Sequence, residues 1–326
     1  MKNIRKILFI SLSNLGDIVL TTPVFDKLCV TFPDAVIDVV TGPAGESIFA
    51  TSPAVRKVIV RKKRQNAGER VSELMDLRKE KYDLVVDLKN SFLPFVSGAR
   101  YKFPFFPVWG RRGHMRDVHL GVIRKLVSSV FENTRFFIPV SKEDRDFVSG
   151  VMGGMAGTKT AAGKVVTVNP GAKSHLKRWG ENRYAELVFR LKKELGCRVF
   201  MVGGSEDIAA ATAIMDISEG AATDLTGKTS VGALYEIIKR SDLFITNDSG
   251  PLHLASAAAT PTVAVFGPSN EKKYGPLSAG SIVLCPEVDC RPCEKAQCSK
   301  GLKDGCISQV TAKQVFEAAK KILRKQ

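Results

Sequence analysis

Short, uninterrupted apolar runs recur along this chain, and most are followed by a polar or glycine-containing turn and then by a helical pattern. Such runs are typical of strands that are buried on both faces, as in parallel sheets. Repeated alternation of strand and helix predicts the α/β class with doubly wound parallel sheets. We expect strands at 6–11, 36–41, 58–60, 84–87, 165–169, 198–202, 243–246 and 263–266.

The chain has 326 residues, which is too long for one ordinary hydrophobic core and indicates two domains. Residues 150–164, GVMGGMAGTKTAAGK, are rich in Gly and Ala and have no clear period, so we interpret them as the interdomain linker. The sequence therefore predicts two Rossmann-like domains, 1–155 and 156–326, facing across a cleft. Between the strands we expect helices at 17–32, 67–81, 181–195, 231–240 and 250–259, with one more at 311–324.

The composition is that of a globular protein, with 44% hydrophobic residues and a mean hydropathy of -0.01. No apolar run is long enough to span a bilayer, and the opening MKNIRKILFISLSNLGD has no signal-cleavage pattern, so we expect a cytoplasmic protein. The net charge of +16 implies an anionic partner, which can be nucleic acid, a membrane surface or a phosphorylated substrate.

A basic and aromatic stretch runs from Leu88 to Arg116 and contains no Asp or Glu. Its cations, Arg111, Arg112 and Arg116 among them, alternate with aromatic side chains. This mixture suits the headgroup layer of an anionic membrane or glycolipid, and we predict such a contact. The alternative is a solvated loop whose aromatic rings fill the core.

The hinge Asn247-Asp248-Ser249-Gly250 joins a predicted strand to a predicted helix. The N-terminus of a helix at the carboxyl edge of a parallel sheet can hold an anion, so this hinge predicts a phosphate site. Gly250 allows close backbone approach, Ser249 offers a hydroxyl, and His253 follows one turn later. The alternative is that Asp248 or Ser249 caps the helix and that His253 is a core residue.

Two further carboxylates occupy loops that follow predicted strands. Asp17 comes after the first strand, in a Rossmann-like opening that lacks the G-x-G-x-x-G fingerprint, so a dinucleotide is not expected there. Its alternatives are a helix cap and a group in the ligand crevice. Glu206 follows Gly203-Gly204 and either accepts from ribose hydroxyls or starts a helix.

Four motifs along most of the chain carry a family resemblance: SLSNLGDIVLTTPVFDKL, NPGAKSHLKRWGENRYAEL, VFMVGGSEDIAAA and TNDSGPLHLASA. In this order they resemble the ADP-heptose:lipopolysaccharide heptosyltransferases of glycosyltransferase family 9, and within it the heptosyltransferase II members. These are inverting enzymes with a two-domain GT-B fold. The resemblance implies an acceptor-binding first domain, a donor-binding second domain, and a last helix that packs back on the first domain.

The same resemblance implies roles for individual residues. Asp17 corresponds to the general base, Lys177 to the phosphate-binding lysine, and Thr229 and Ser230 lie beside the adenine, although by position they also suit a helix cap. The implied partners are ADP-heptose and an anionic lipopolysaccharide precursor at the cytoplasmic face of the inner membrane, where the protein would be peripheral. Lys173 and Arg178, near Lys177, have no such support, and we expect them to be solvated.

Five of the seven cysteines are bunched near the C-terminus, including Cys290-x2-Cys293-x4-Cys298-x7-Cys306. A cytosolic chain seldom carries structural disulfides, so the alternatives are a structural zinc site and a set of reduced thiols. We expect catalysis to need no metal cofactor, because protein cations and a helix dipole can replace Mg²⁺.

Two other functions remain alternatives. One is a different GT-B enzyme, such as a nucleotide-sugar epimerase or a transferase that uses another donor. The other is a basic nucleic-acid-binding module, which is motivated by the charge alone. The chain has no helix-turn-helix, zinc-finger or RNA-recognition signature, so we expect no nucleic-acid partner.

Overall fold

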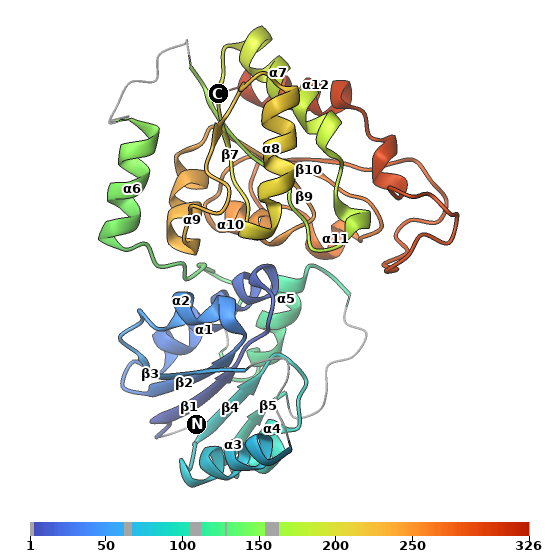
Figure 1. The fold of residues 1–326 in the computed structure, drawn as a ribbon. Coiled ribbons are helices and arrows are strands. Elements are labelled where there is room, and N and C mark those ends of the chain that lie inside the picture. Colours follow the sequence, from blue (N-terminus) through green and yellow to red (C-terminus); the bar gives the residue numbers. More distant parts are fainter. Residues whose placement is uncertain (1–2, 62–66, 105–111, 128, 154–162, 326) are drawn as a thin grey trace. The chain divides into compact units, whose positions relative to one another are not determined.

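The protein is described by a computed structural model that covers residues 3–61, 67–104, 112–127, 129–153 and 163–325. The chain forms two compact units, residues 1–139 and 140–326 (Figure 1). The second unit begins earlier than the predicted boundary at residue 156. The reason is that α6 (Lys142–Met152), which the sequence analysis did not anticipate, packs on α9 (Val231–Arg240) of the second unit.

The first unit is built on a parallel five-stranded sheet in the order β3-β2-β1-β4-β5. This order confirms the predicted doubly wound sheet, because the chain winds to one side from β1 and then returns to the other. The strand β5 was not predicted, because it is only three residues long. The strands are β1 (Lys6–Ile10), β2 (Val36–Thr41), β3 (Val55–Val60), β4 (Leu84–Asp87) and β5 (Tyr101–Phe103).

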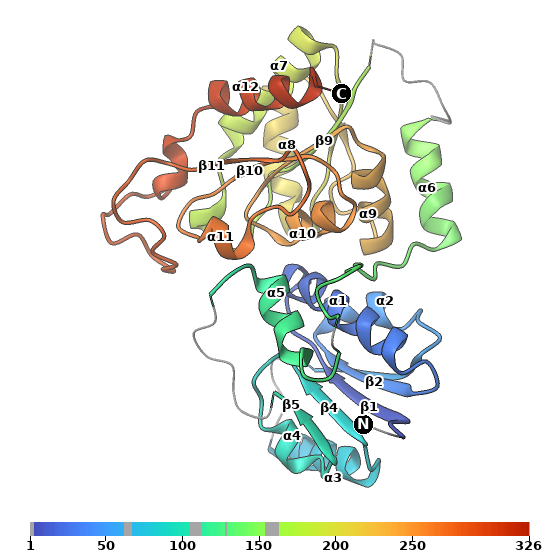
Figure 2. The ribbon, with the colours of Figure 1, turned by 180° about the vertical axis from the view of Figure 1, so that it is seen from behind.

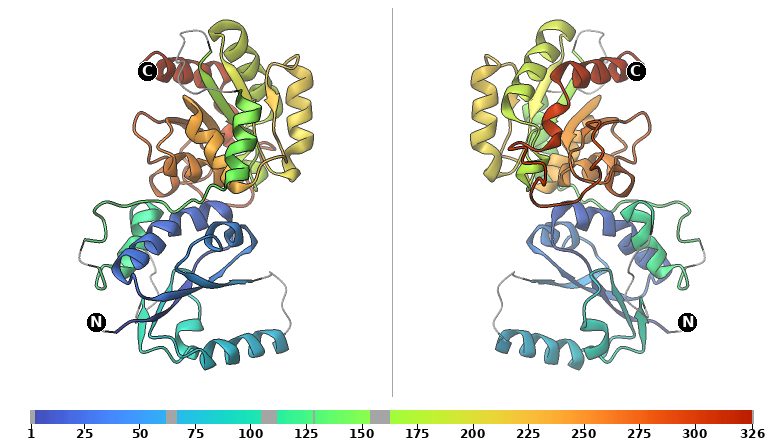
Figure 3. Two further views of the ribbon diagram at one scale, coloured as in Figure 1. Left: turned by 90° about the vertical axis from the view of Figure 1, so that its left-hand side faces the viewer. Right: turned by 90° about the vertical axis from the view of Figure 1, so that its right-hand side faces the viewer.

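Helices cover both faces of this sheet (Figure 3). On one face α1 (Leu15–Thr31) and α2 (Pro43–Phe49) bury a cluster of aromatic rings around Phe9, with Phe25 and Phe49 each less than 6 Å from it between centroids. On the other face α3 (Ala67–Lys79) and α4 (Leu93–Val96) pack on Leu8, Ile10 and Val85. A short helix, α5 (Met115–Leu120), packs on α1 and leads into a 3₁₀ turn at Gly121–Ile123.

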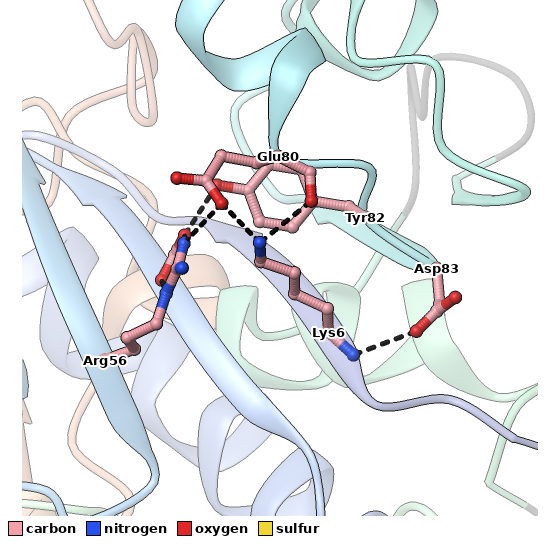
Figure 4. Close-up of polar contacts among 6 residues, drawn as sticks. Lys6, Arg56, Glu80, Tyr82 and Asp83 are labelled. Atoms are coloured by element: carbon pink, nitrogen blue, oxygen red, sulfur yellow. Dashed lines mark hydrogen bonds and ion pairs between the residues drawn. The ribbon is translucent and has the colours of Figure 1, made fainter.

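A network of charged side chains gathers near the amino ends of these strands (Figure 4). Arg56 donates to the buried Asp38 through Nε (2.9 Å) and Nη2 (2.5 Å), and its Nη2 lies 2.8 Å from Glu80 Oε2. Tyr82 donates its hydroxyl to Asp38 (2.6 Å), and Lys6 pairs with Glu80. The hydrogen bond from Lys6, followed by that from Arg56, lowers the pKa of Glu80 to about 2.

The second unit is built on a parallel six-stranded sheet in the order β11-β10-β9-β6-β7-β8. It repeats the winding of the first sheet, with the reversal between β6 and β9. The four predicted strands are confirmed at β6, β7, β9 and β10, while the short β8 and β11 were not anticipated. The bounds are β6 (Val165–Asn169), β7 (Arg198–Met201), β8 (Thr223–Asp224), β9 (Leu243–Asn247), β10 (Thr262–Val265) and β11 (Ile282–Leu284).

Helices also cover both faces of the second sheet (Figure 2). On one face α7 (Glu181–Leu195), α8 (Ile208–Ile217) and α12 (Ala312–Leu323) share a core with the strands. On the other face α10 (Gly250–Ala257) packs through Leu252 on β10 and lies beside α9. The remaining turns are α11 (Glu271–Tyr274) and the 3₁₀ segments His175–Lys177, Ser205–Asp207 and Cys306–Gln309.

The last helix, α12, packs within the second unit, and the expectation that it packs on the first domain stays a prediction. The apolar side chains of α12, including Val315 and Phe316, are buried in the core of the second unit, and Arg190 of α7 lies over the ring of Phe316 at 4.0 Å. Its apolar face is therefore used within its own unit. None of the helices in the described ranges is both long and apolar enough to cross a membrane.

Candidate active site

Each sheet has one point at which its winding reverses, between β1 and β4 in the first unit and between β6 and β9 in the second. Open α/β sheets bind ligands outside the carboxyl ends of the strands at such points. In the first unit, Lys89 follows β4 and donates from Nζ to Ser13 Oγ after β1 (3.2 Å). The backbone is closely packed there, because a Cβ on Gly42 would lie 2.6 Å from the Ser13 carbonyl oxygen.

Asp17 lies at this edge, at the third residue of α1, and is half-buried. The helix begins at Leu15 after Asn14, so Asp17 is not the N-cap residue. Its Oδ2 accepts a hydrogen bond from the Asn14 side-chain amide (2.9 Å). An amide holds the carboxylate in place without neutralising its charge, and it occupies only part of the acceptor capacity of Asp17.

In the second unit a buried polar network ties the ends of β6 and β9 together. Asn169 Nδ2 donates to Thr246 Oγ1 (3.1 Å) and to Ser249 Oγ (3.0 Å). Tyr184 donates its hydroxyl to Asn247 Oδ1 (2.9 Å), and burial raises the pKa of this phenol. Asn247 in turn donates to the carbonyl of Pro170 (2.7 Å). The hinge before α10 is therefore held rigidly by side chains from three elements.

The predicted phosphate-binding lysine lies at the same edge. Lys177 Nζ is 2.6 Å from Asp248 Oδ2, and the lysine side chain is 33% exposed while that of Asp248 is 6% exposed. A buried carboxylate requires a partner, so Asp248 fixes the lysine ammonium at the surface of the hinge. In this geometry Asp248 orients Lys177 and does not itself contact an anion.

The other predicted residues of the hinge divide between surface and core. Ser249 is the N-cap of α10 in extended conformation, its side chain accepts no capping hydrogen bond from the helix, and both Ser249 and Gly250 are half-buried. Pro251 has no N–H, so it contributes no donor at this terminus. His253 lies within the helix and is 4% exposed, which places it among the core residues.

The loop after β7 carries a buried carboxylate, Asp207, that was not predicted as a site residue. Asp207 accepts from the backbone N–H of Gly204 (3.0 Å) and lies 3.9 Å from Arg178, while burial raises its pKa. It fits only because residue 171 is glycine, where a Cβ would lie 2.2 Å from Asp207 Oδ2. Glu206 is exposed. The acid three residues after Gly204 was the signal that could have identified this cap.

Arg178 was expected to be solvated, and its side chain is 41% exposed, but it also contacts two groups of the protein. Its Nε donates to the carbonyl of Ala172 (2.8 Å), and its Nη2 faces Asp207. It therefore ties the loop after β6 to the loop after β7. Lys173 is exposed.

Ser230 caps α9, as its position before the helix predicted. Its Oγ accepts from the N–H of Ala233 (3.0 Å) and donates to Asp144 of α6. Thr229 is half-buried beside it. The cap leaves Ser230 exposed at the carboxyl side of the sheet, so capping does not prevent contact with a ligand.

The predicted acceptor-side arginines are only partly placed. Arg111 lies outside the described residues. Arg112 is exposed, whereas Arg116 donates from Nε to Asp117 Oδ1 (2.8 Å), the first acid after the basic stretch. This neighbour reduces the net charge that Arg116 offers to a membrane.

The four clustered cysteines face one cavity of roughly 300 Å³, also lined by Leu176 and Leu302. All four are free thiols, and burial raises the pKa of Cys306. Within the described parts of the chain, no group of three or more metal-ligating side chains is arranged to hold an ion. The structural zinc remains a prediction for Cys290, Cys293, Cys298 and Cys306.

The match to a known protein family begins where the second unit begins, at residue 140. The family described as glycosyltransferase family 9 (heptosyltransferase) matches residues 140–303, which covers most of the second unit. The chain belongs to this family. It is therefore a glycosyltransferase, as the four motifs predicted.

Similar proteins extend the match over both units. Lipopolysaccharide heptosyltransferase 2 of Escherichia coli K12 is 25% identical over 98% of each chain. The crystal structure of a glycosyltransferase family 9 protein from Veillonella parvula superposes with a TM-score of 0.81 at 25% identity, covering 100% of this chain and 99% of that one. The structure of E. coli ADP-heptose lipopolysaccharide heptosyltransferase II gives 0.75 at 22% identity, covering 98% and 99%. The predicted GT-B fold class is confirmed.

Proposed function

We propose that this glycosyltransferase moves heptose from ADP-heptose to the inner core of lipopolysaccharide, with inversion at the anomeric carbon. The observation that carries the proposal is the hinge of the second unit, where buried Asp248 holds Lys177 beside the half-buried start of α10. A cation next to a helix N-terminus is suited to a diphosphate. The similar E. coli protein, whose description names ADP-heptose, supports this donor.

In the proposed reaction Asp17 takes the proton of an acceptor hydroxyl. The hydroxyl oxygen then forms a bond to the anomeric carbon while the bond from that carbon to the diphosphate oxygen breaks. The electron pair leaves with ADP, and the growing negative charge is stabilised by Lys177 and by the backbone N–H groups around Ser249 and Gly250. These donors are fixed before reaction by the Asn169 network, so little reorganisation is needed.

The remaining donor contacts are assigned by position in the second unit. We propose that Glu206 accepts from the ribose hydroxyls and that Thr229 and Ser230 lie beside the adenine. Glu206 and Ser230 are both exposed on loops that follow strands. His253 would then support the hinge from within α10 rather than contact ADP directly, because it is buried.

The acceptor is proposed to be an anionic lipopolysaccharide precursor, reached by a peripheral protein at the cytoplasmic face of the inner membrane. The acid-free stretch 88–116, with Arg112 exposed, supports this assignment. Catalysis is proposed to need no metal. Metal analysis of the purified protein tests whether the cavity thiols hold structural zinc; a stoichiometric ion lost on mutating Cys290 and Cys293 would support it.

A panel of nucleotides and donors tests the function as a whole. Calorimetry should show ADP binding, and turnover should require ADP-heptose rather than UDP-sugars. A preference for a UDP-sugar would favour the alternative GT-B reading, in which the protein acts on another donor or epimerises it. Binding to generic duplex that is stronger than binding to ADP would instead revive the nucleic-acid alternative.

A further inference from the structure

The helices α3 and α4 lie side by side and form one layer on the first sheet (Figures 1 and 2). Their inward side chains, Leu74 and Leu77 from α3 and Leu93 and Val96 from α4, belong to the same apolar cluster. Because the inner sides are used in this core, the side chains that remain exposed form the outer face of the layer. We call it the α3–α4 face.

This face is unusually apolar for a surface. Val71 and Met75 of α3 are 50% and 59% exposed, and Phe92 and Phe95 at α4 are 85% and 59% exposed. Phe92 is the most exposed large apolar side chain in the described parts of the protein. Exposed apolar side chains that are grouped together, rather than scattered, mark an interaction surface.

The charges around these side chains are positive. Lys102 Nζ lies 5.9 Å from the centre of the Phe95 ring, and Lys89 and Arg100 flank α4 in the acid-free stretch. Two acids of α3 are paired with cations: Asp76 with Lys79 (3.1 Å), and Glu73, 13% exposed, with Arg61 (2.7 Å). The face therefore combines apolar anchors with net positive charge.

We propose that the α3–α4 face docks on an anionic lipid membrane, with Val71, Met75, Phe92 and Phe95 entering the headgroup layer. Apolar side chains gain free energy at the acyl boundary, and the surrounding cations are attracted to anionic headgroups. This charge complementarity selects a lipid surface over a neutral protein groove. The proposal rests on the proposed function, because it assigns the site at which a membrane-held acceptor is approached.

The test compares two double variants in sedimentation with vesicles of phosphatidylcholine and phosphatidylglycerol. Phe92→Ser with Met75→Gln removes one anchor from each helix. Both changes suit the fold, since Phe92 is the N-cap of α4, where Ser is favoured, and Gln is a good helix former at an exposed site. We expect the partition coefficient to fall at least about tenfold.

The matched control is Val30→Gln with Ile217→Gln, which removes two exposed apolar side chains elsewhere, 72% and 53% exposed. The control should bind like the wild type, and binding of the wild type should weaken with salt and on pure phosphatidylcholine. Equal binding by both double variants at unchanged melting temperature overturns the proposal. A wild-type protein that does not sediment with the vesicles also overturns the proposal. The α3–α4 face would then be a candidate binding site for a protein partner.

Transfer to a water-soluble acceptor oligosaccharide separates this proposal from the proposed function. The Phe92→Ser, Met75→Gln variant should transfer heptose to the soluble acceptor at the wild-type rate. A wild-type protein that uses no heptose donor would refute the function and leave the vesicle result standing. Loss of vesicle binding only in an Arg112→Ser, Arg116→Ser variant would overturn the α3–α4 face in favour of the later part of the basic stretch.

Discussion

Asp38 and Asp17 are carboxylates of the same unit, but their surroundings are opposite. Asp38 lies toward the amino ends of the strands, is 1% exposed, and accepts from Arg56 and Tyr82. Asp17 lies at the carboxyl edge, is half-buried, and accepts from the neutral amide of Asn14. The first is neutralised by a cation, whereas the second is oriented without being neutralised.

This difference separates a structural carboxylate from one that is available for chemistry. A carboxylate accepts about four hydrogen bonds, and a guanidinium that binds two of those sites holds it firmly as an anion. A carboxylate held by an amide keeps its charge and some of its acceptor sites. The Lys177–Asp248 pair is intermediate, because the acid is buried while the lysine is one-third exposed and can turn toward a ligand.

The largest expected effect is a loss of turnover when Asp17, at the carboxyl edge of the first sheet, is changed. Asp17→Asn should lower turnover by roughly two to four orders of magnitude, since Asn cannot accept the proton, while ADP affinity and melting temperature stay near wild type. Steady-state kinetics, calorimetry and thermal melting on one purified variant measure all three. Asp34→Asn, a change at an exposed aspartate of the same unit, is the control. Near-normal turnover of a stable Asp17→Asn protein would show that Asp17 has a structural role, as Asp38 has.

The intermediate case should respond in nucleotide binding and also in stability, because Lys177→Ala leaves the buried Asp248 without its cation. Lys177→Ala should weaken ADP binding by roughly 1 to 3 kcal/mol, the range for a charge-assisted contact. Calorimetry with ADP measures it, and Lys173→Ala, an exposed lysine four residues earlier, is the matched control. Unchanged affinity in the Lys177 variant, or equal loss in both, would remove this lysine from the nucleotide site.

A change at the amino ends of the strands of the first sheet should affect stability and leave turnover unchanged. Asp38→Asn removes the charge that Arg56 and Tyr82 share, and should lower the free energy of unfolding by about 1 to 3 kcal/mol. The lower part of this range applies if water solvates the partly exposed Arg56 after the change. Chemical denaturation measures the loss. A variant with wild-type stability but reduced turnover would contradict the division between the two edges.

The smallest effect concerns pH. The pKa of Glu80 is about 2 in the folded protein and near 4.5 for the free group, so the unfolded chain binds the additional proton between these values. Its contribution is present above about pH 4.5 and is lost as the pH falls toward 2. Glu80→Gln should therefore be less stable than wild type at neutral pH, and the difference should shrink in acid. Denaturation curves at several pH values test this, and a pH-independent difference would contradict it.

Local sequence determined much of this fold. Continuous apolar runs such as 36–41, 84–87 and 165–169 match their strands, and the helices 181–195 and 231–240 match theirs, because a strand buried on both faces and an amphipathic helix each leave a pattern within a few residues. The motifs likewise located Asp17, Lys177 and Ser249 at the carboxyl edges. Short elements such as β5 and α4 leave too few residues for a pattern and were missed.

Contacts between distant residues could be decided only by tertiary structure. The sequence places Asp248 beside Ser249, but only the adjacency of β6 and β9 brings Lys177 to 2.6 Å from it. Arg178 and Asp207 likewise meet because the loops after β6 and β7 are neighbours, and α12 packs on its own unit because that unit has the apolar face to cover. Charge pairing and burial depend on which loops the sheet order makes neighbours, and sequence spacing does not encode that order.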